Sequence, residues 1–255
     1  MYKIKPMSEY IKTLSFELAV YAKGDRSAKR VVLVLPGRLD TKDYIHMTSL
    51  VNALAEQGYY AVSFDPPGSW ESGGDTKEYS TTNYIKAVNE LIEYFGNKPT
   101  VLAGHSRGGT VSILVGATNQ NVKAIIPIMA TYGAASAPTE NDIKAGEHRT
   151  TRDLPPGGSR TGKQVEFTLP LSYFDDAKRY KPAEEPKGIK IPKLVIYGRS
   201  DSFTSPERVK EVFASASEPK ELLGLDCDHN YRYYPKMIEK VNNAVVAFLQ
   251  KYMPE

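Results

Sequence analysis

Hydrophobic residues in this chain form short continuous runs that are separated by amphipathic stretches. In "RVVLVLPG" at 30–37, β-branched residues and leucines follow one another without polar alternation until Pro-Gly ends the run. Such runs are typical of strands that are buried on both faces, as in a parallel sheet. Residues 12–22 alternate only in part and predict one or two edge strands. Further buried runs lie at 59–64, 100–104, 122–130 and 193–198.

Helical periodicity fills most of the intervals between these runs. Over 43–57 and 82–96, apolar residues recur every three or four positions, and a glycine ends each stretch. Repeated alternation of strands and helices predicts an α/β fold, in which helices cover both faces of a mostly parallel sheet. The remaining helical stretches are 108–118, 206–216 and 235–252.

The alternation lapses between about residues 131 and 190. This part carries "SAPTEND", "RDLPPGGSRTGK" and "KPAEEPKGIKIP", and a structureless loop of that length is uncommon in a compact domain. The aromatic residues of 165–180 favour an ordered segment over a disordered one. We therefore predict a single domain, 1–255, with a small cap insertion at about 131–190 that contains one or two helices.

Composition and charge exclude several functional classes. The 255 residues carry a formal net charge of +3, which gives no reason to expect a nucleic acid or an acidic membrane as partner. Cys227 is the only cysteine, so neither an intrachain disulfide nor a Cys-based zinc site is expected. The N-terminal residues lack an apolar signal region, and no stretch approaches 18 uninterrupted apolar residues. We expect a cytoplasmic protein without membrane insertion, metal or cofactor; the sequence leaves its oligomeric state open.

The stretch "GHSRG" at 104–108 matches the pattern G-x-S-x-G. In a nucleophile elbow, a serine lies on a strained turn between a strand and a helix, and glycines let the two elements cross closely. The preceding run "TVLA" and the following apolar helical stretch supply that context. Ser106 is therefore the candidate nucleophile, whereas an incidental serine in a glycine-rich loop is the alternative.

A serine nucleophile needs a base and a group that orients the base. Of the four histidines, only His229 follows the last predicted strand and precedes the final helix. Asp201 follows the run "KLVIYG", at the strand end where open α/β sheets carry functional groups. The order of Ser106, Asp201 and His229 along the chain suits this chemistry. Rival acids are Asp175, Asp176, Asp226 and Asp228.

An oxyanion hole is expected from two backbone N–H groups. The N–H of Arg107 lies directly after the serine, at the start of the predicted helix. The second donor should come from the loop after the first central strand, where "LPGRLD" offers the N–H of Arg38. A simple Pro-Gly turn is the alternative interpretation of that loop.

Taken together, these segments resemble the α/β-hydrolase family over roughly residues 12–252. The resemblance rests on "VLVLPG", "SFDPPGSWES", "AGHSRGG", "YGRSD" and "CDHNYR". It is similar to compact serine esterases such as the cinnamoyl and feruloyl esterases, and to the catalytic domains of acyl-peptide hydrolases. The resemblance implies that Ser106, Asp201 and His229 are a catalytic triad and that the Arg38 and Arg107 amides are the oxyanion hole.

Two departures from the family pattern concern the substrate site. Pro36-Gly37 stands where many relatives carry His-Gly. Trp70 replaces the second glycine of a family turn, so Asp65 and Trp70 are candidates for the site entrance; a structural turn with a surface tryptophan is the alternative. The aromatic residues of the cap are candidates for the pocket, although cap aromatics commonly pack among themselves: Tyr132, Phe167, Tyr173 and Phe174. Arg38, Arg107 and Arg199 follow predicted strands, which suggests a substrate with a carboxylate or phosphate; solvated or salt-bridged arginines are the alternative.

These observations predict a serine hydrolase that cleaves a small-molecule carboxylic ester or other acyl substrate through an acyl-enzyme. Three alternatives stay open. One is a serine peptidase or acyl-peptide hydrolase, which uses the same triad. The second is a non-enzymatic binding protein on the same fold, because a fold does not fix a function. The third is a non-hydrolytic enzyme, such as a cofactor-free haloperoxidase or a lyase.

Overall fold

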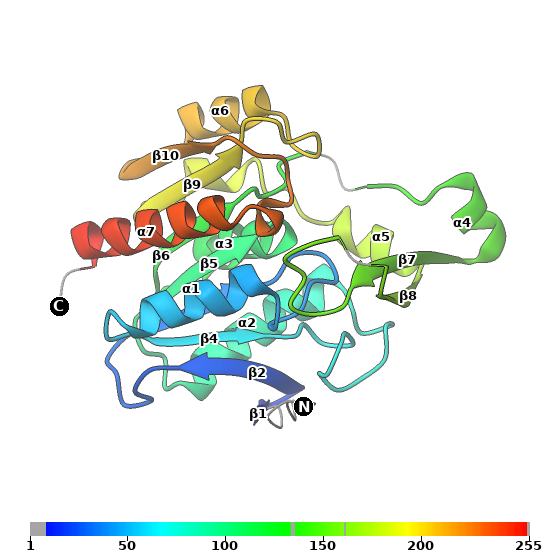
Figure 1. Cartoon of the computed structure of the whole chain (residues 1–255), viewed down its shortest axis with the longest axis horizontal. Coiled ribbons are helices and arrows are strands. Elements are labelled where there is room, and N and C mark those ends of the chain that lie inside the picture. Colours follow the sequence, from blue (N-terminus) through cyan, green and yellow to red (C-terminus); the bar gives the residue numbers. More distant parts are fainter. Residues whose placement is uncertain (1–8, 134–135, 161, 254–255) are drawn as a thin grey trace.

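The computed structural model describes residues 9–133, 136–160 and 162–253, and its centre is an eight-stranded sheet (Figure 1). The strand order is β1-β2-β4-β3-β5-β6-β9-β10. β1 and β2 are antiparallel to their neighbours, and the other six strands are parallel. The strands are β1 (Glu9–Lys12), β2 (Glu17–Lys23), β3 (Val31–Leu35), β4 (Tyr60–Phe64), β5 (Thr100–His105), β6 (Val122–Ile128), β9 (Lys193–Gly198) and β10 (Lys220–Leu225).

Helices cover both faces of this sheet. On one face lie α1 (Ile45–Ala55) and α7 (Pro235–Tyr252); on the other lie α2 (Thr81–Tyr94), α3 (Arg107–Thr118) and α6 (Pro206–Ser215) (Figure 1). The predicted α/β-hydrolase architecture is thus present, with helix boundaries within two residues of those expected from periodicity. Among the described residues, no helix is both long enough and apolar enough to span a membrane.

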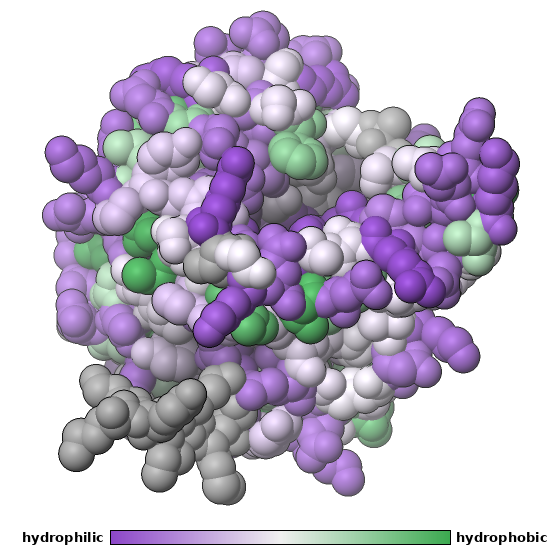
Figure 2. Space-filling view, turned by 45° about the vertical axis from the view of Figure 1, so that its right-hand side comes forward, coloured by the Kyte–Doolittle hydropathy of each residue, from purple (hydrophilic) through white to green (hydrophobic). Residues whose placement is uncertain are grey.

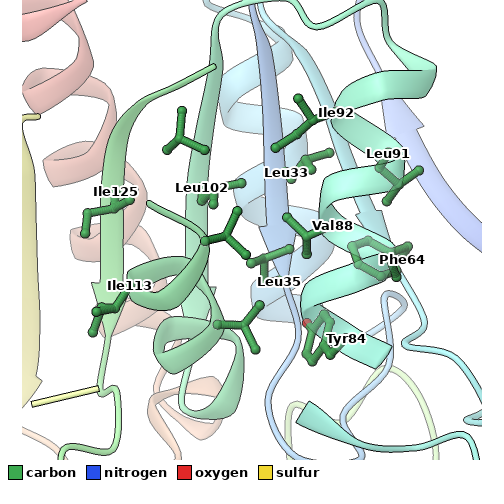
Figure 3. Packing of buried hydrophobic residues seen from close by; sticks show 14 of the residues in the cluster. Leu33, Leu35, Phe64, Tyr84, Val88, Leu91, Ile92, Leu102, Ile113 and Ile125 are labelled. Atoms are coloured by element: carbon green, nitrogen blue, oxygen red, sulfur yellow. The ribbon is translucent and has the colours of Figure 1, made fainter. Parts of the chain in front are cut away.

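The continuous apolar runs are explained by burial on two sides. In β3, Leu33 and Leu35 pack toward α2 and α3, whereas Val32 and Val34 pack toward α1 and α7. Figure 3 shows Val88 and Leu91 of α2 on the side of the sheet to which Leu33 and Leu35 point. Because both sets of side chains leave water, the strand needs apolar residues at every position.

The cap connects β6 to β9 and contains a small antiparallel sheet. Its hydrophobic core joins Phe167, Leu169 and Phe174 to Leu39 and Tyr79 of the main domain. In Figure 2 the part of the cap that projects to the right is mostly hydrophilic at its surface. The cap elements are α4 (Glu140–Ala145), β7 (Glu147–Asp153), β8 (Gln164–Pro170), α5 (Ser172–Ala177) and the 3-10 turn η1 (Glu185–Lys187).

Two features were not expected from the sequence. The cap contains helices, α4 and α5, as predicted, but it also contains the hairpin β7–β8, which was not predicted. β10 is a further parallel strand after β9, and its first four residues are only partly buried. An edge strand that is paired on one side shows no continuous buried pattern, so its sequence resembles a loop.

Candidate active site

Ser106 lies between the end of β5 and the start of α3, in a strained backbone conformation. Its φ and ψ are 51° and −116°, which a residue with a side chain rarely adopts. Gly108 is required here, because a Cβ at that position would lie 2.1 Å from the backbone oxygen of Leu35. Gly104 is required for the same reason: its Cβ would lie 2.2 Å from the backbone carbon of Gly108. The glycines thus allow the close crossing of strand and helix that a nucleophile elbow needs.

Ser106, His229 and Asp201 form a chain of hydrogen bonds. The Oγ of Ser106 lies 2.8 Å from Nε2 of His229, and Nδ1 of His229 lies 2.8 Å from Oδ2 of Asp201. A carboxylate only accepts, so Nδ1 carries the hydrogen and Nε2 is free to accept the serine proton. The structure thus brings together the three side chains that the sequence selected.

The surroundings of Asp201 keep its carboxyl group ionised. Burial by itself raises the pKa, but the hydrogen bond and charge of His229 and the amides of Phe203 and Thr204 lower the pKa below its ordinary value. Oδ1 accepts hydrogen bonds from these two amides at 2.8 and 3.3 Å. The ring of Phe203 lies 4.6 Å from that of His229, centroid to centroid, and covers one side of the imidazole.

The rival acids have other partners. Asp226 pairs with Arg199, and Oδ1 of Asp228 accepts a hydrogen bond from the Asn230 amide. Asp176 accepts hydrogen bonds from the first turn of α2. Asp175 accepts a hydrogen bond from Nζ of Lys178 at 2.9 Å. Among the described residues, Nδ1 of His229 bonds to Asp201 and to none of these rivals.

Arg38 and Arg107 present their backbone N–H groups near the serine. Arg107 is the first residue of α3, and Arg38 follows Gly37 after β3. Within 9–133, 136–160 and 162–253, neither backbone N–H donates a hydrogen bond. Gly37 allows a close approach, since a Cβ there would lie 2.6 Å from Oδ2 of Asp40. Both N–H groups are available for a developing negative charge.

A cavity of about 590 Å³ opens over Ser106. Its wall includes the side chains of Ser106 and His229 together with Arg38 and Arg107. The cap closes the cavity from above with Tyr173, Ala177, Tyr180 and Pro182, while Thr151, Gln164, Asn230 and Tyr233 supply neutral polar groups. A volume of this size suits a small-molecule substrate.

Five sequence-predicted pocket residues do not line this cavity, and their assignment is corrected. Phe167 and Phe174 belong to the hydrophobic core of the cap, and Tyr132 packs in the core of the main domain. Trp70 packs against Phe167 and donates its indole N–H to the backbone oxygen of Leu39. Arg199 is half-exposed and pairs with Asp226. The aromatic side chains Phe174 and Trp70 pack the cap against the main domain. From sequence alone, an aromatic residue with this packing role looks the same as one that contacts a substrate.

Asp65, the other candidate for the entrance, is fully buried and has a structural role. Its carboxylate accepts hydrogen bonds from the hydroxyl of Thr41 and the amides of Lys42 and Glu71. Nζ of Lys42 lies 3.4 Å from the same carboxylate. Asp65 therefore ties together two loops that leave the carboxyl edge of the sheet.

Sequence reasoning missed His105 and Asp40, which support the site from behind. Nε2 of His105 lies 3.0 Å from the backbone oxygen of His229, and Nδ1 lies 3.4 Å from Oδ2 of Asp40. Burial raises the pKa of Asp40, but the hydrogen bond and charge of His105 outweigh it, so the pKa lies well below its ordinary value. A histidine at the carboxyl end of a buried strand was a signal that could have drawn attention to His105.

Asp40, His105 and His46 also form a group with the composition of a metal site. One ligand atom from each lies within 4.8 Å of the others, and all three residues are buried. Both ring nitrogens of His46 lack a hydrogen-bond partner in the described part of the chain. The carboxylate of Asp40, however, already faces His105 and, at 3.9 Å, Arg152, which balance its charge without an ion.

Sequence comparison relates this chain to an α/β-hydrolase model and to individual proteins. The model described as "alpha/beta hydrolase fold" matches residues 30–147. An uncharacterized 31.7 kDa protein of Escherichia coli, from the traX-finO intergenic region, is 25% identical over 240 residues, covering 79% of this chain and 84% of that protein. Mouse mitochondrial palmitoyl-protein thioesterase ABHD10 is 23% identical over 189 residues, covering 71% of this chain and 62% of its own.

Structural comparison extends the match to nearly the whole chain. Est1E from Butyrivibrio proteoclasticus, with ferulic acid bound, superposes with a TM-score of 0.77 at 16% identity, covering 97% of this chain and 100% of that chain. Mouse ABHD10 superposes with a TM-score of 0.73 at 19% identity, covering 96% and 98%. The resemblance to the α/β-hydrolase family predicted from the sequence is confirmed, and the chain has the α/β-hydrolase fold.

Proposed function

We propose that this protein is a serine hydrolase that cleaves a carboxylic ester. The observation that carries the proposal is the continuous hydrogen-bond chain from the Oγ of Ser106 through His229 to Asp201, with 2.8 Å at each step. The cavity over Ser106 and the strained elbow backbone support it. Several of the matched proteins are esterases or thioesterases, and this chain shares their fold, which also supports a hydrolase activity.

In the first half of the reaction, the Oγ of Ser106 attacks the ester carbonyl carbon while Nε2 of His229 takes the hydroxyl proton. The negative charge on the former carbonyl oxygen is stabilised by the backbone N–H groups of Arg38 and Arg107. When the tetrahedral intermediate collapses, the ester C–O bond breaks and the imidazolium gives its proton to the leaving alcohol.

In the second half, water replaces the alcohol. His229 takes a proton from water, and the resulting hydroxide attacks the acyl carbon that is bound to Ser106. Collapse of this intermediate breaks the bond to Oγ, which regains the proton from Nε2. Asp201 holds the imidazole in the reactive tautomer and balances its positive charge during both halves.

The test is turnover of 4-nitrophenyl butyrate by the wild type and Ser106→Ala, with covalent labelling by a fluorophosphonate probe. We expect turnover and labelling in the wild type, and a fall in kcat of about 10⁴-fold or more in the variant. Aminoacyl 4-nitroanilides in parallel distinguish an esterase from a peptidase. If the wild type neither turns over an ester or anilide nor reacts with the probe, the serine-hydrolase proposal fails and a binding protein on this fold is favoured.

A further inference from the structure

Two arginines in the cavity wall carry charges that no carboxylate balances directly. Arg107 is 9% exposed, Arg38 is half-buried, and both line the cavity beside Ser106. In the described part of the chain, no carboxylate oxygen is recorded within ion-pair distance of either guanidinium, and the Nε atom of each is buried without a hydrogen-bond partner. Burying a cation without a counter-ion costs folding free energy, so the presence of two such arginines in one wall calls for an explanation.

The partners of these guanidiniums are neutral groups. Arg107 donates to the hydroxyls of Tyr173 and Thr81, and its guanidinium carbon lies 4.6 Å from the centre of the Tyr173 ring. Arg38 contacts Nε2 of His148 at 2.6 Å, and its guanidinium carbon lies 5.4 Å from the same tyrosine ring. Tyr173 thus brings the two positive charges together on one wall.

Two acidic groups are linked to these arginines through an intervening residue. Asp176 accepts a hydrogen bond from the backbone N–H of Thr81, whose hydroxyl in turn faces Arg107. Asp142 lies 3.1 Å from His148, the histidine that contacts Arg38. Among the described residues, neither carboxylate forms an ion pair with Arg38 or Arg107.

Two other arginines of the same cavity have acidic partners. Arg232 pairs with Asp153 at 2.8 Å, and Arg152 lies 3.9 Å from Asp40. The two acids that line the cavity are therefore both engaged. Arg160 also lines the cavity, and its guanidinium carbon lies 5.6 Å from the centre of the Tyr233 ring. Arg38 and Arg107 are the two cavity arginines that both lack an ion pair among the described residues and share contact with Tyr173. An anionic group that enters the cavity would meet complementary charge next to the reacting serine.

We propose that the cavity binds substrates that carry an anionic oxygen group, a carboxylate or a phosphate, which Arg38 and Arg107 recognise. This inference names the substrate class of the proposed hydrolase and rests on that function for its kinetic consequences. Guanidinium groups suit both anions, because their N–H donors match paired oxygens. The anion lies close to the scissile carbonyl, since both arginines also present their backbone N–H groups to the candidate oxyanion hole.

The kinetic test compares two esters with five-carbon acyl groups, 4-nitrophenyl hemiglutarate and 4-nitrophenyl valerate. We expect the wild type to favour the anionic ester by about tenfold or more in kcat/KM, less at high salt. Arg38→Gln and Arg107→Gln, assayed singly, should reduce that preference, expressed as the ratio of kcat/KM for the anionic ester to kcat/KM for the neutral ester; urea unfolding is the control for folding. Arg208→Gln removes a partly exposed arginine paired with Glu211 on α6 and should leave the ratio unchanged.

A binding test makes the inference independent of turnover. The thermal stability of Ser106→Ala is measured with glutarate, with valeramide as a neutral compound of the same chain length, and with inorganic phosphate. Stabilisation by glutarate alone identifies a carboxylate site, and stabilisation by phosphate alone identifies a phosphate site; either must weaken in the double variants with Arg38→Gln or Arg107→Gln. Equal rates for the two esters together with no anion binding overturn the proposal. If no ester is hydrolysed but anions bind, the hydrolase proposal fails and the anion site stands.

Discussion

Nε2 of His105 lies 3.0 Å from the backbone carbonyl oxygen of His229. A carbonyl oxygen only accepts, so the ring nitrogen donates, and the turn that carries Ser106 is joined directly to the loop that carries His229. The same ring lies 5.2 Å from the imidazole of His229, centroid to centroid. In the proposed mechanism His105 is therefore a positioning residue: it touches no reacting atom, but its hydrogen bond helps to set the distance between Ser106 and His229.

Replacing His105 tests this role. His105→Leu removes the donor, and we expect kcat for a neutral ester to fall by about 10²-fold with little change in KM, because a small misplacement of a catalytic group is costly. His105→Gln keeps an N–H donor of similar reach and should restore part of the loss. Equal activity of His105→Leu and the wild type would show that the hydrogen bond does not position His229.

Asp40 is predicted to contribute stability that depends on pH. Its pKa is lower in the folded protein than the ordinary value, because the opposing effect of burial is outweighed by His105 and the nearby cationic groups. A carboxyl group with a depressed pKa stabilises the fold above its unfolded pKa of about 3.9, and the contribution is lost as the pH falls below that value. We expect Asp40→Asn to destabilise the protein by about 1–3 kcal/mol at pH 7 and by less at pH 3, measured by urea unfolding. A loss that is independent of pH would contradict the assignment.

Asp201→Asn should leave the fold intact and impair catalysis. An asparagine side chain can donate its amide N–H to Nδ1 of His229, which selects the tautomer that cannot accept a proton at Nε2. We expect kcat to fall by about 10⁴-fold at neutral pH, with urea unfolding as the control for folding. Retention of more than a tenth of the wild-type kcat would exclude Asp201 as the orienting acid.

The sequence predicted the parts of the fold in which one physical cause dominates. Runs such as Val31–Leu35 are apolar at every position because both faces are buried, and no alternative structure explains them as well. The elbow around Ser106 was recognisable because a close crossing of strand and helix excludes a Cβ at positions 104 and 108, and both positions are glycine. His229 and Asp201 were found by chain order, which the fold constrains.

The cap was harder to predict because its structure depends on contacts rather than on local pattern. β7, "EHRTTRD", is a polar strand that pairs only with β8, and most of its side chains are partly or fully exposed. Phe174 and Trp70 are aromatic, as pocket residues often are, but they pack in the hydrophobic cluster that joins the cap to the main domain. The sequence predicted that Arg38 and Arg107 contribute backbone N–H groups and, on weaker grounds, positive charge to the site. Their shared contact with Tyr173 depends on how the cap packs on the main domain, which the local sequence does not show.

Cys227 is predicted to be unreactive in the folded protein. Burial, followed by the charges of Asp228, Asp201 and Asp226, raises the pKa of its thiol to about 12. Since the thiolate is the reactive form, modification by a disulfide reagent at pH 8 should be about a thousandfold slower than for an unfolded cysteine. Reaction in urea provides the control. Rapid modification of the native protein would show that the loop before His229 opens.

Gly108 tests whether the close crossing of strand and helix holds the nucleophile in place. In Gly108→Ala the new Cβ would lie 2.1 Å from the backbone oxygen of Leu35 and 2.6 Å from its carbonyl carbon. Neither atom can move without shifting β3, so we expect a loss of about 1–3 kcal/mol in unfolding free energy. Because Ser106 and Arg38 lie on the two elements that must separate, kcat should fall as well.

The matched control is Gly188→Ala, in the turn after η1. Gly188 has a φ of −90°, and the nearest atom to a new Cβ would be the backbone oxygen of Glu185 at 3.6 Å, an ordinary contact. Its unfolding free energy should change by no more than about 0.5 kcal/mol, and its ester turnover should match that of the wild type. If Gly108→Ala has the same unfolding free energy and ester turnover as this control, the elbow tolerates a larger separation of β3 and α3. In that case, the strained φ of Ser106 alone must explain why its side chain faces the cavity.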